Sequence, residues 1–180
     1  MKPAIKVDNK SIANKIFLRK KATEHINELN VLDLFAGNNV LWRNIDKNRY
    51  YGVELMPGKG ANLNADSKQV VRSVDLSDFN VIDCDSFEIP FDICKYLLTN
   101  SQIKSGTVVI YTAMTNIFTQ LPNVCINDLG IRSMYKVAPS LFNANGITYF
   151  YDMLANFGVK QVEFYEHIDN YTKHYGYFII

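Results

Sequence analysis

The sequence is poor in the residues that build disulfide frameworks and metal centres. Its three cysteines, Cys84, Cys94 and Cys125, are an odd number without Cys-x-x-Cys spacing, and the three histidines are scattered. This pattern argues against a disulfide-linked fold and against a zinc site. We therefore expect a protein of the reducing cytoplasm that holds no metal ion.

Long apolar runs are also lacking. No stretch approaches the roughly 18 apolar residues that a membrane-spanning helix needs, and the N-terminus has no signal-peptide core. We expect neither secretion nor contact with a membrane. No repeat, low-complexity tract or Pro/Gly-rich linker divides the 180 residues. A chain of this length corresponds to one domain of about 100–200 residues, which predicts a single domain over 1–180.

Charge of one sign is lacking overall, since the net charge is +1, but the first 21 residues are basic. They hold one acid, Asp8, and seven cations: Lys2, Lys6, Lys10, Lys15, Arg19, Lys20 and Lys21. Residues 11–29 place apolar side chains at helical spacing, which predicts a basic N-terminal helix within residues 1–29. Its basic face is either a solvated surface or a contact for the phosphates of a nucleic acid. The sequence leaves the oligomeric state open.

Strand and helix patterns alternate along the rest of the chain. Apolar runs predict strands at 31–35, 50–55, 61–65, 79–84 and 106–114. Helices are expected at about 39–45, 67–73, 90–104, 124–136 and 138–157. Residues 159–167 and 171–180 are rich in β-formers and predict a terminal hairpin. The pattern indicates a Rossmann-like α/β fold, whose mostly parallel sheet ends in an antiparallel C-terminal strand.

Two segments at the start of this core indicate a nucleoside site. The first strand runs into the glycine turn Phe35-Ala36-Gly37-Asn38-Asn39, and the second strand ends at Glu54. Such a turn lets backbone approach a ligand, and the acid binds ribose hydroxyls. The chain lacks the Gly-x-Gly-x-x-Gly of dinucleotide sites, so a ligand without a pyrophosphate fits better. S-adenosylmethionine (SAM) is such a ligand.

These features resemble class I SAM-dependent methyltransferases over residues 31–180. The resemblance implies that SAM contacts Asp33, Phe35, Ala36, Gly37, Asn38, Glu54 and Asp66. Each acid has a structural alternative: Asp33 caps the turn, Glu54 is a surface residue, or Asp66 caps a helix. Asn39 replaces a glycine that the family often has, although asparagine tolerates left-handed backbone.

A second stretch, from Asp83 to Pro90, follows the fourth strand and carries the predicted chemistry. It is similar to the Asp-x-Asp-Pro-Phe-Gly-x-Pro stretch of tRNA guanine-N2 dimethyltransferases, except that Ser86 and Glu88 replace a proline and a glycine. We predict that Asp83 or Asp85 accepts a hydrogen from an exocyclic amine and that Phe87 stacks on the base. Alternatively, Asp83 only ends the strand and Phe87 packs in the core.

The leading interpretation is a SAM-dependent methyltransferase that methylates an exocyclic amine of a nucleic acid, with RNA ahead of DNA. Two alternatives stay open: a non-catalytic SAM-fold binding or scaffold protein, and a methyltransferase acting on protein or a small molecule. Trp42 is expected to be buried in a helix rather than beside the cofactor. The C-terminal tyrosines are expected to pack in the sheet rather than to bind nucleic acid.

Overall fold

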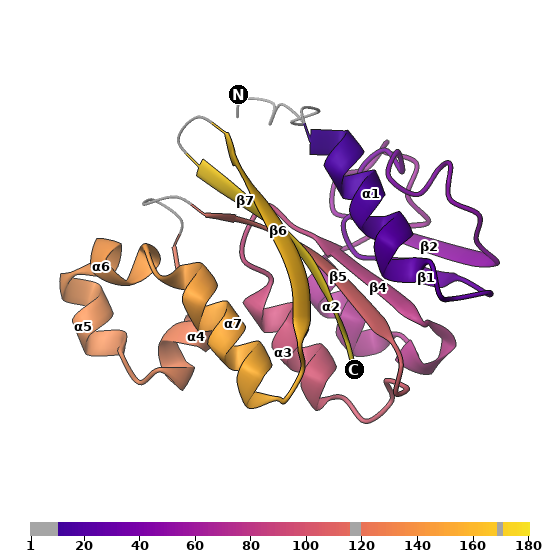
Figure 1. Ribbon diagram of the computed structural model, residues 1–180. Coiled ribbons are helices and arrows are strands. Elements are labelled where there is room, and N and C mark those ends of the chain that lie inside the picture. Colours follow the sequence, from indigo (N-terminus) through magenta and orange to yellow (C-terminus); the bar gives the residue numbers. More distant parts are fainter. Residues whose placement is uncertain (1–10, 116–119, 169–170) are drawn as a thin grey trace.

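The computed structural model describes residues 11–115, 120–168 and 171–180, so Lys2, Lys6 and Lys10 lie outside the described residues. Its centre is a sheet of seven strands in the spatial order β3-β2-β1-β4-β5-β7-β6 (Figure 1). The strands are β1 (Asn30–Asp33), β2 (Arg49–Glu54), β3 (Leu63–Asn64), β4 (Val81–Asp85), β5 (Val108–Thr115), β6 (Gln161–Ile168) and β7 (Tyr171–Ile179).

Strands β1 to β5 are parallel, whereas β7 pairs antiparallel with both β5 and β6. The predicted mixed α/β sheet and its terminal hairpin are therefore confirmed. The chain runs outward from β1 to β3 on one side and from β4 to β5 on the other. Strand order thus reverses between β1 and β4, and open α/β sheets bind ligands at the carboxyl ends of the strands at such a point.

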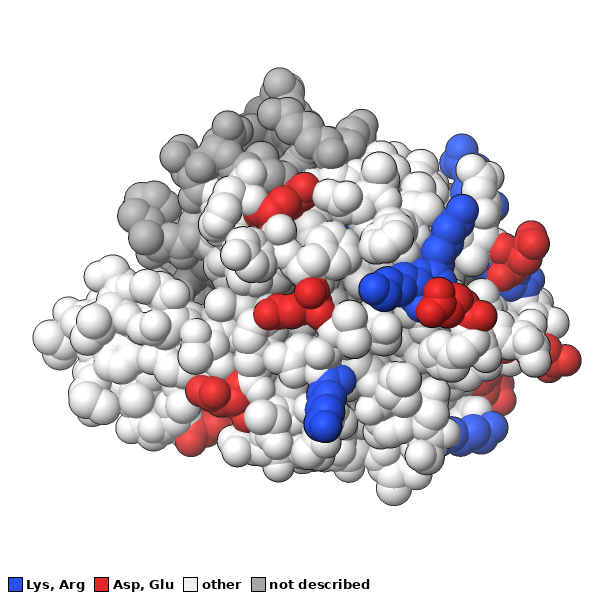
Figure 2. Space-filling model, viewed as in Figure 1, with Lys and Arg blue, Asp and Glu red and all other residues white. Residues whose placement is uncertain are grey.

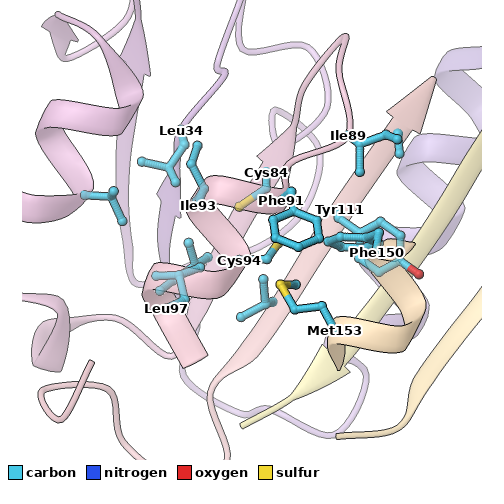
Figure 3. Packing of buried hydrophobic residues seen from close by; sticks show 14 of the residues in the cluster. Leu34, Cys84, Ile89, Phe91, Ile93, Cys94, Leu97, Tyr111, Phe150 and Met153 are labelled. Atoms are coloured by element: carbon cyan, nitrogen blue, oxygen red, sulfur yellow. The ribbon is translucent and has the colours of Figure 1, made fainter. Parts of the chain in front are cut away.

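Helices cover both faces of the sheet, but unequally (Figure 1). Helices α2 (Ser67–Ser73), α3 (Phe91–Thr99), α4 (Asn123–Asp128) and α7 (Gly146–Asn156) contribute to the larger core. Leu97 of α3 and Phe150 of α7 pack in this core, where the Phe150 ring lies against Tyr111 of β5 (Figure 3). The smaller core, on the other face, receives Leu18 and Ala22 of α1 (Ile12–Thr23).

Successive side chains of a central strand point to opposite faces of the sheet, so each strand contributes to both cores. In β5, Val109 and Tyr111 belong to the larger core, while Val108 and Ile110 belong to the smaller one. A parallel strand covered on both faces reads as a continuous apolar run, which is why 106–114 is a clear strand pattern.

Three expected helices have different limits. The segment 90–104 is helical only to Thr99, and 124–136 is divided into α4 and α5 (Arg132–Val137). Gly130, at φ +65°, separates α4 from α5 with the left-handed residue that commonly ends a helix. The segment 138–157 is divided into α6 (Pro139–Asn143) and α7, which is followed by Gly158 at φ +74°.

The helix expected at 39–45 is absent, so that prediction is wrong. The connection from β1 to β2 consists of turns, with Gly37 at φ +51° and Asn39 at φ +56°. Two left-handed residues and adjacent asparagines, which compete for backbone hydrogen bonds, disfavour a helix this short. Trp42 is buried as expected, although in a turn rather than a helix.

The N-terminal helix is shorter than predicted and is turned differently. It ends at Thr23 instead of near Leu29, and Phe17 of the expected apolar stripe is 57% exposed. Arg19 of the expected basic face is fully buried. In the part of the chain that the structure describes, no helix is both long and apolar enough to cross a membrane.

Candidate active site

The candidate site lies at the carboxyl ends of β1, β2 and β4. The glycine turn follows β1, Glu54 ends β2, and the stretch from Asp83 to Pro90 overlaps the end of β4. Because these strands are parallel neighbours around the reversal of strand order, their ends meet at one edge of the sheet.

Two hydrogen bonds hold the glycine turn against β2, and a third ties it to the end of β1. Ala36 N donates to Val53 O (2.9 Å), and Gly37 N donates to a carboxylate oxygen of Glu54 (3.0 Å). Phe35 N donates to Asp33 (3.1 Å) at the start of the turn. A Cβ at Gly52 would lie 2.9 Å from the Cβ of Ala36, so glycine is required there for this close approach.

Glu54 joins two loops of the site. Its Oε2 accepts from Gly37 N, and its Oε1 accepts from Met56 N at 3.0 Å in the loop after β2. The side chain is half-buried rather than a free surface glutamate. A carboxylate in this position is suited to accept hydroxyl hydrogens from a ligand, which stays a prediction.

Asp66 caps α2, which is the structural alternative to its predicted contact with SAM. Its side chain accepts from Lys68 N at 2.8 Å, which satisfies one of the unpaired N–H groups of the first turn. The residue is exposed. A contact with adenine is a prediction that this capping role does not exclude, since a carboxylate accepts several hydrogen bonds.

A pocket of about 280 Å³ opens beside the turn. Its lining residues come from the glycine turn, from α2, from the segment after β4, from the first turn of α3 and from the residue before α4: Phe35, Lys68, Ser86, Phe87, Glu88, Ile89, Pro90, Asp92, Ile93 and Pro122. Phe35 and Phe87 supply aromatic walls, and Phe87 is 57% exposed at the rim rather than packed in the core. A partly apolar pocket with a few polar groups is typical of a small-molecule site.

Asp83 does not open into this pocket. It is fully buried on the α1 face of the sheet, where Arg19 donates to both of its oxygens through Nε (2.7 Å) and Nη2 (2.9 Å). Trp42 Nε1 also donates to Oδ2 at 2.7 Å. Both oxygens of Asp83 thus accept hydrogen bonds from buried protein groups on the α1 face, and its contact with a substrate amine stays a prediction.

Asp85 is paired in the same way with the next cation of α1. Lys15 Nζ lies 2.6 and 2.8 Å from the two carboxylate oxygens of Asp85, whose side chain is 6% exposed. Burial opposes ionisation of Asp85, but the charges of Arg19 and Lys15 outweigh this effect and lower its pKa. Asp85 is therefore a carboxylate at neutral pH, already neutralised by the protein.

Asp33 is the third buried acid of this cluster, and its pKa, like that of Asp83, is raised. It is the register partner of Asp83, and its oxygens accept from Phe35 N and from the Tyr50 hydroxyl (2.9 Å), both neutral donors. Burial and the neighbouring Asp83 raise its pKa to about 8. Asp33 thus holds a proton at neutral pH, which balances three acids against the two cations.

Lys15, Arg19 and Tyr50 were not singled out by sequence reasoning as parts of this cluster. A spacing signal was nevertheless present. Residues i and i+4 of a helix are about 6 Å apart, and residues i and i+2 of a strand are about 6.6 Å apart on one face. Lys15 and Arg19 therefore match Asp85 and Asp83 in separation, which is the pairing found in the structure.

Comparisons with known proteins identify no family. No family model and no curated protein matches the chain. Among solved structures, it is similar to an O-methyltransferase family protein from Burkholderia thailandensis, with 10% sequence identity and a TM-score of 0.42. The match covers 92% of this chain and 56% of that one, so the chain spans little more than half the length of the matched protein. The likeness concerns the fold alone.

Proposed function

We propose that this protein is a SAM-dependent methyltransferase. The observation that carries the proposal is the convergence of the glycine turn, Glu54 and the pocket beside Phe35 at the reversal of strand order.

The residues present suit the charged and polar groups of SAM. Asn39 Oδ1 is buried at the turn without a hydrogen-bond partner, which leaves an acceptor for an ammonium group. Glu54 accepts ribose hydroxyls, and Phe35 and Phe87 provide apolar walls for a planar ring. When bound, SAM supplies an electrophilic methyl group. The protein's own contribution is to orient the two reactants and to exclude water.

We further propose a nucleic acid as the methyl acceptor. Two features support this: the exposed ring of Phe87 at the rim, which suits stacking on a base, and the exposed Lys20 and Lys21 of α1. Figure 2 shows Lys and Arg side chains gathered over the region of α1 on this face. Lys15 and Arg19 do not contribute to a phosphate contact, because they are paired with Asp85 and Asp83.

One observation favours a second candidate, a SAM-fold binding protein without catalysis. Both carboxylates predicted to polarise the acceptor amine are neutralised by cations of α1. A carboxylate whose lone pairs are engaged by Lys or Arg is a poor hydrogen-bond acceptor for a substrate. Methyl transfer by positioning alone stays compatible with this geometry.

Calorimetry with SAM and S-adenosylhomocysteine, followed by a labelled-methyl screen, separates these functions. Binding with label transferred to RNA or DNA supports the proposed function. Label transferred only to protein or small molecules from a lysate supports a methyltransferase that acts on protein or a small molecule. Binding without any transfer supports the non-catalytic protein. Binding of neither compound shows that the proposed SAM site is wrong.

The sharpest single-residue test is Glu54→Ala. Loss of a charged acceptor for buried hydroxyls is expected to weaken SAM binding by about 1.5–3 kcal/mol. Glu28→Ala, which removes an exposed glutamate, is the matched control and is expected to leave the dissociation constant unchanged. An unaltered dissociation constant in Glu54→Ala removes this residue from the site.

A further inference from the structure

The glycine turn and the residues that follow it have little support from hydrogen bonds of their own backbone. Between β1 and β2, residues 37–45 form turns, held internally by bonds such as Asn39 N to Ala36 O (2.8 Å) and Ile45 N to Trp42 O (3.3 Å). In the middle of this segment lies Trp42, which is fully buried in the smaller core beside residues of α1. The indole thus anchors the segment in this core, together with Ile45 at its end.

The indole is connected to α1 through one carboxylate. Trp42 Nε1 and Arg19 Nε both donate to Asp83 Oδ2, each at 2.7 Å. The guanidinium carbon of Arg19 lies 5.9 Å from the centre of the Trp42 ring. All three side chains are buried, so none of these bonds competes with water.

Arg19 makes the bond between Trp42 and Asp83 dependent on charge. Removing Arg19 leaves Asp83 as a buried carboxyl without its bidentate partner, and such a group protonates or draws in water. Protonation of Asp83 or entry of water alters the carboxylate oxygen that accepts from Trp42 Nε1. A buried indole N–H requires a hydrogen-bond partner, so the indole then shifts with it.

We infer that Arg19 and Trp42 are positioning residues for the ligand-binding turn, with Asp83 as the shared acceptor between them. Helix α1 therefore belongs to the site although it contributes no ligand contact. Through this triad it holds residues 37–45 in the arrangement that presents Gly37 and Asn39. The binding measurement with S-adenosylhomocysteine rests on the proposed function, whereas the fluorescence and amide-exchange measurements do not.

The competing explanation is that hydrophobic packing alone fixes Trp42. Its neighbours Leu18, Val31 and Val81 are apolar and fully buried, and they would hold a ring of the same size without any hydrogen bond. The two explanations differ in what happens when the charge of Arg19 or the N–H of Trp42 is removed.

Because Trp42 is the single tryptophan of the chain, its fluorescence reports on this position alone. The test variant is Arg19→Met, and the control is Lys20→Met, which changes the exposed neighbour on the same helix. In Arg19→Met, acrylamide quenching is expected to rise several-fold and amide exchange in 36–45 by about tenfold, as expected for local opening. Lys20→Met is expected to match the unaltered protein in both measurements.

Two further measurements decide the matter if Arg19→Met does not fold. Trp42→Phe keeps an aromatic ring in the core but deletes the N–H, and it is expected to raise exchange in 36–45. In the unaltered protein, the amides of α1 and those of Asn39 and Ile45 are expected to exchange as one unit with the same denaturant dependence. Independent opening of the two segments, or unchanged exchange in a folded variant, overturns the inference.

The ligand arm uses S-adenosylhomocysteine as the probe. Its dissociation constant is expected to rise about tenfold in Arg19→Met, because a disordered turn must be ordered on binding, and to recover partly in Arg19→Lys. A folded Arg19→Met with quenching raised but affinity unchanged refutes the positioning role. If the unaltered protein binds no S-adenosylhomocysteine, the proposed function fails, while the exchange measurements still decide whether the triad holds the turn.

Discussion

At the scale of single residues, the smaller core is unusual in its buried charge. Asp33, Asp83 and Asp85 share the cations Arg19 and Lys15, and both Arg19 and Asp83 are inaccessible to solvent. A buried ion pair adds little net stability compared with apolar residues of the same size, but breaking one is costly. The cluster therefore fixes which face of α1 lies on the sheet more than it strengthens the fold.

The protonated state of Asp33 predicts a specific pH dependence. Its pKa is raised to about 8, so its contribution to stability is fully present below the pKa of the unfolded chain, near 3.8. That contribution falls as pH rises and is lost above about 8, because the folded state then gives up its extra proton. Asp33→Asn, which mimics the protonated form, is expected to flatten this decline of the unfolding free energy, measured by urea denaturation, between pH 3.8 and about 8.

The exposed acid Asp46 provides the control for this measurement. Asp46→Asn is expected to keep the decline of the unfolding free energy with pH that the unaltered protein shows. An equally steep decline in Asp33→Asn would mean that another group holds the proton.

Asn39 predicts a backbone effect at the glycine turn. Its φ of +56° costs asparagine little but strains a β-branched residue. Asn39→Gly is expected to fold normally but to bind SAM more weakly, because it removes the unpartnered Oδ1 acceptor. Asn39→Val is expected to lose about 1–2 kcal/mol of stability. Chemical denaturation measures the stability of both variants, with Asn38→Val as the control at an exposed neighbour without positive φ, and calorimetry measures SAM binding. Unchanged SAM binding in Asn39→Gly would show that Oδ1 does not accept from the ligand.

At the scale of elements, the strands are specified more firmly than the helices. β5 is the clearest case, since it pairs with β4 on one side and with β7 along its whole length on the other. The helices that follow it are short, with five to eleven residues each from α4 to α7. Short helices depend on the surface they pack against, so their limits follow the core rather than their own propensity.

Gly176 lets β7 approach Tyr111 more closely than a residue with a side chain could. A Cβ at this position would clash with the hydroxyl and two ring atoms of Tyr111, whose ring is itself packed against Phe150. Gly176→Ala is expected to cost about 1–3 kcal/mol in thermal or chemical unfolding, as overpacking usually does.

The matched control is Gly146→Ala. Its added Cβ meets only the ends of the Ile89 and Leu121 side chains, at 2.7 and 3.2 Å. Such ends can turn aside, so a smaller loss than in Gly176→Ala is expected. Equal losses would show that the Tyr111 ring moves as easily as an aliphatic side chain.

At the scale of the whole molecule, the net charge of +1 gives no general attraction for polyanions. Any nucleic-acid contact must therefore come from a local group of cations. Lys20 and Lys21 are exposed on α1, while Lys15 and Arg19 face inward. The cations available to phosphates on this helix are fewer than its sequence suggests.

This arrangement sharpens the prediction for nucleic-acid binding. Replacing Lys20 and Lys21 by Met is expected to weaken RNA binding without changing SAM binding. It should also reduce the slope of log K against log salt by about 0.7–0.9 for each lost phosphate contact. Filter binding over a salt series measures both effects. Lack of binding near ~50 mM salt, or a flat salt dependence, would make protein or a small molecule the better candidate acceptor.

The sequence by itself determined the order and type of the strands and the position of the candidate site. Strand patterns depend on alternation and apolar runs, which are local, so β1, β2, β4, β5 and the hairpin were all expected near their observed limits. The glycine turn and Glu54 were recognisable because their chemistry depends on residues adjacent in the chain. The left-handed backbone that Asn39 tolerates is likewise a local property.

Only the tertiary structure decided which side chains are free to act. Lys15, Arg19, Asp83 and Asp85 read as a basic face and a reactive pair of acids, but folding brings them together as buried ion pairs across about 65–70 positions of sequence. Trp42, in the turns at 39–45, is likewise bonded to a distant residue, Asp83 of β4. Burying a charge is so costly that the nearest opposite charge decides its role, and that neighbour is set by the fold rather than by the local sequence.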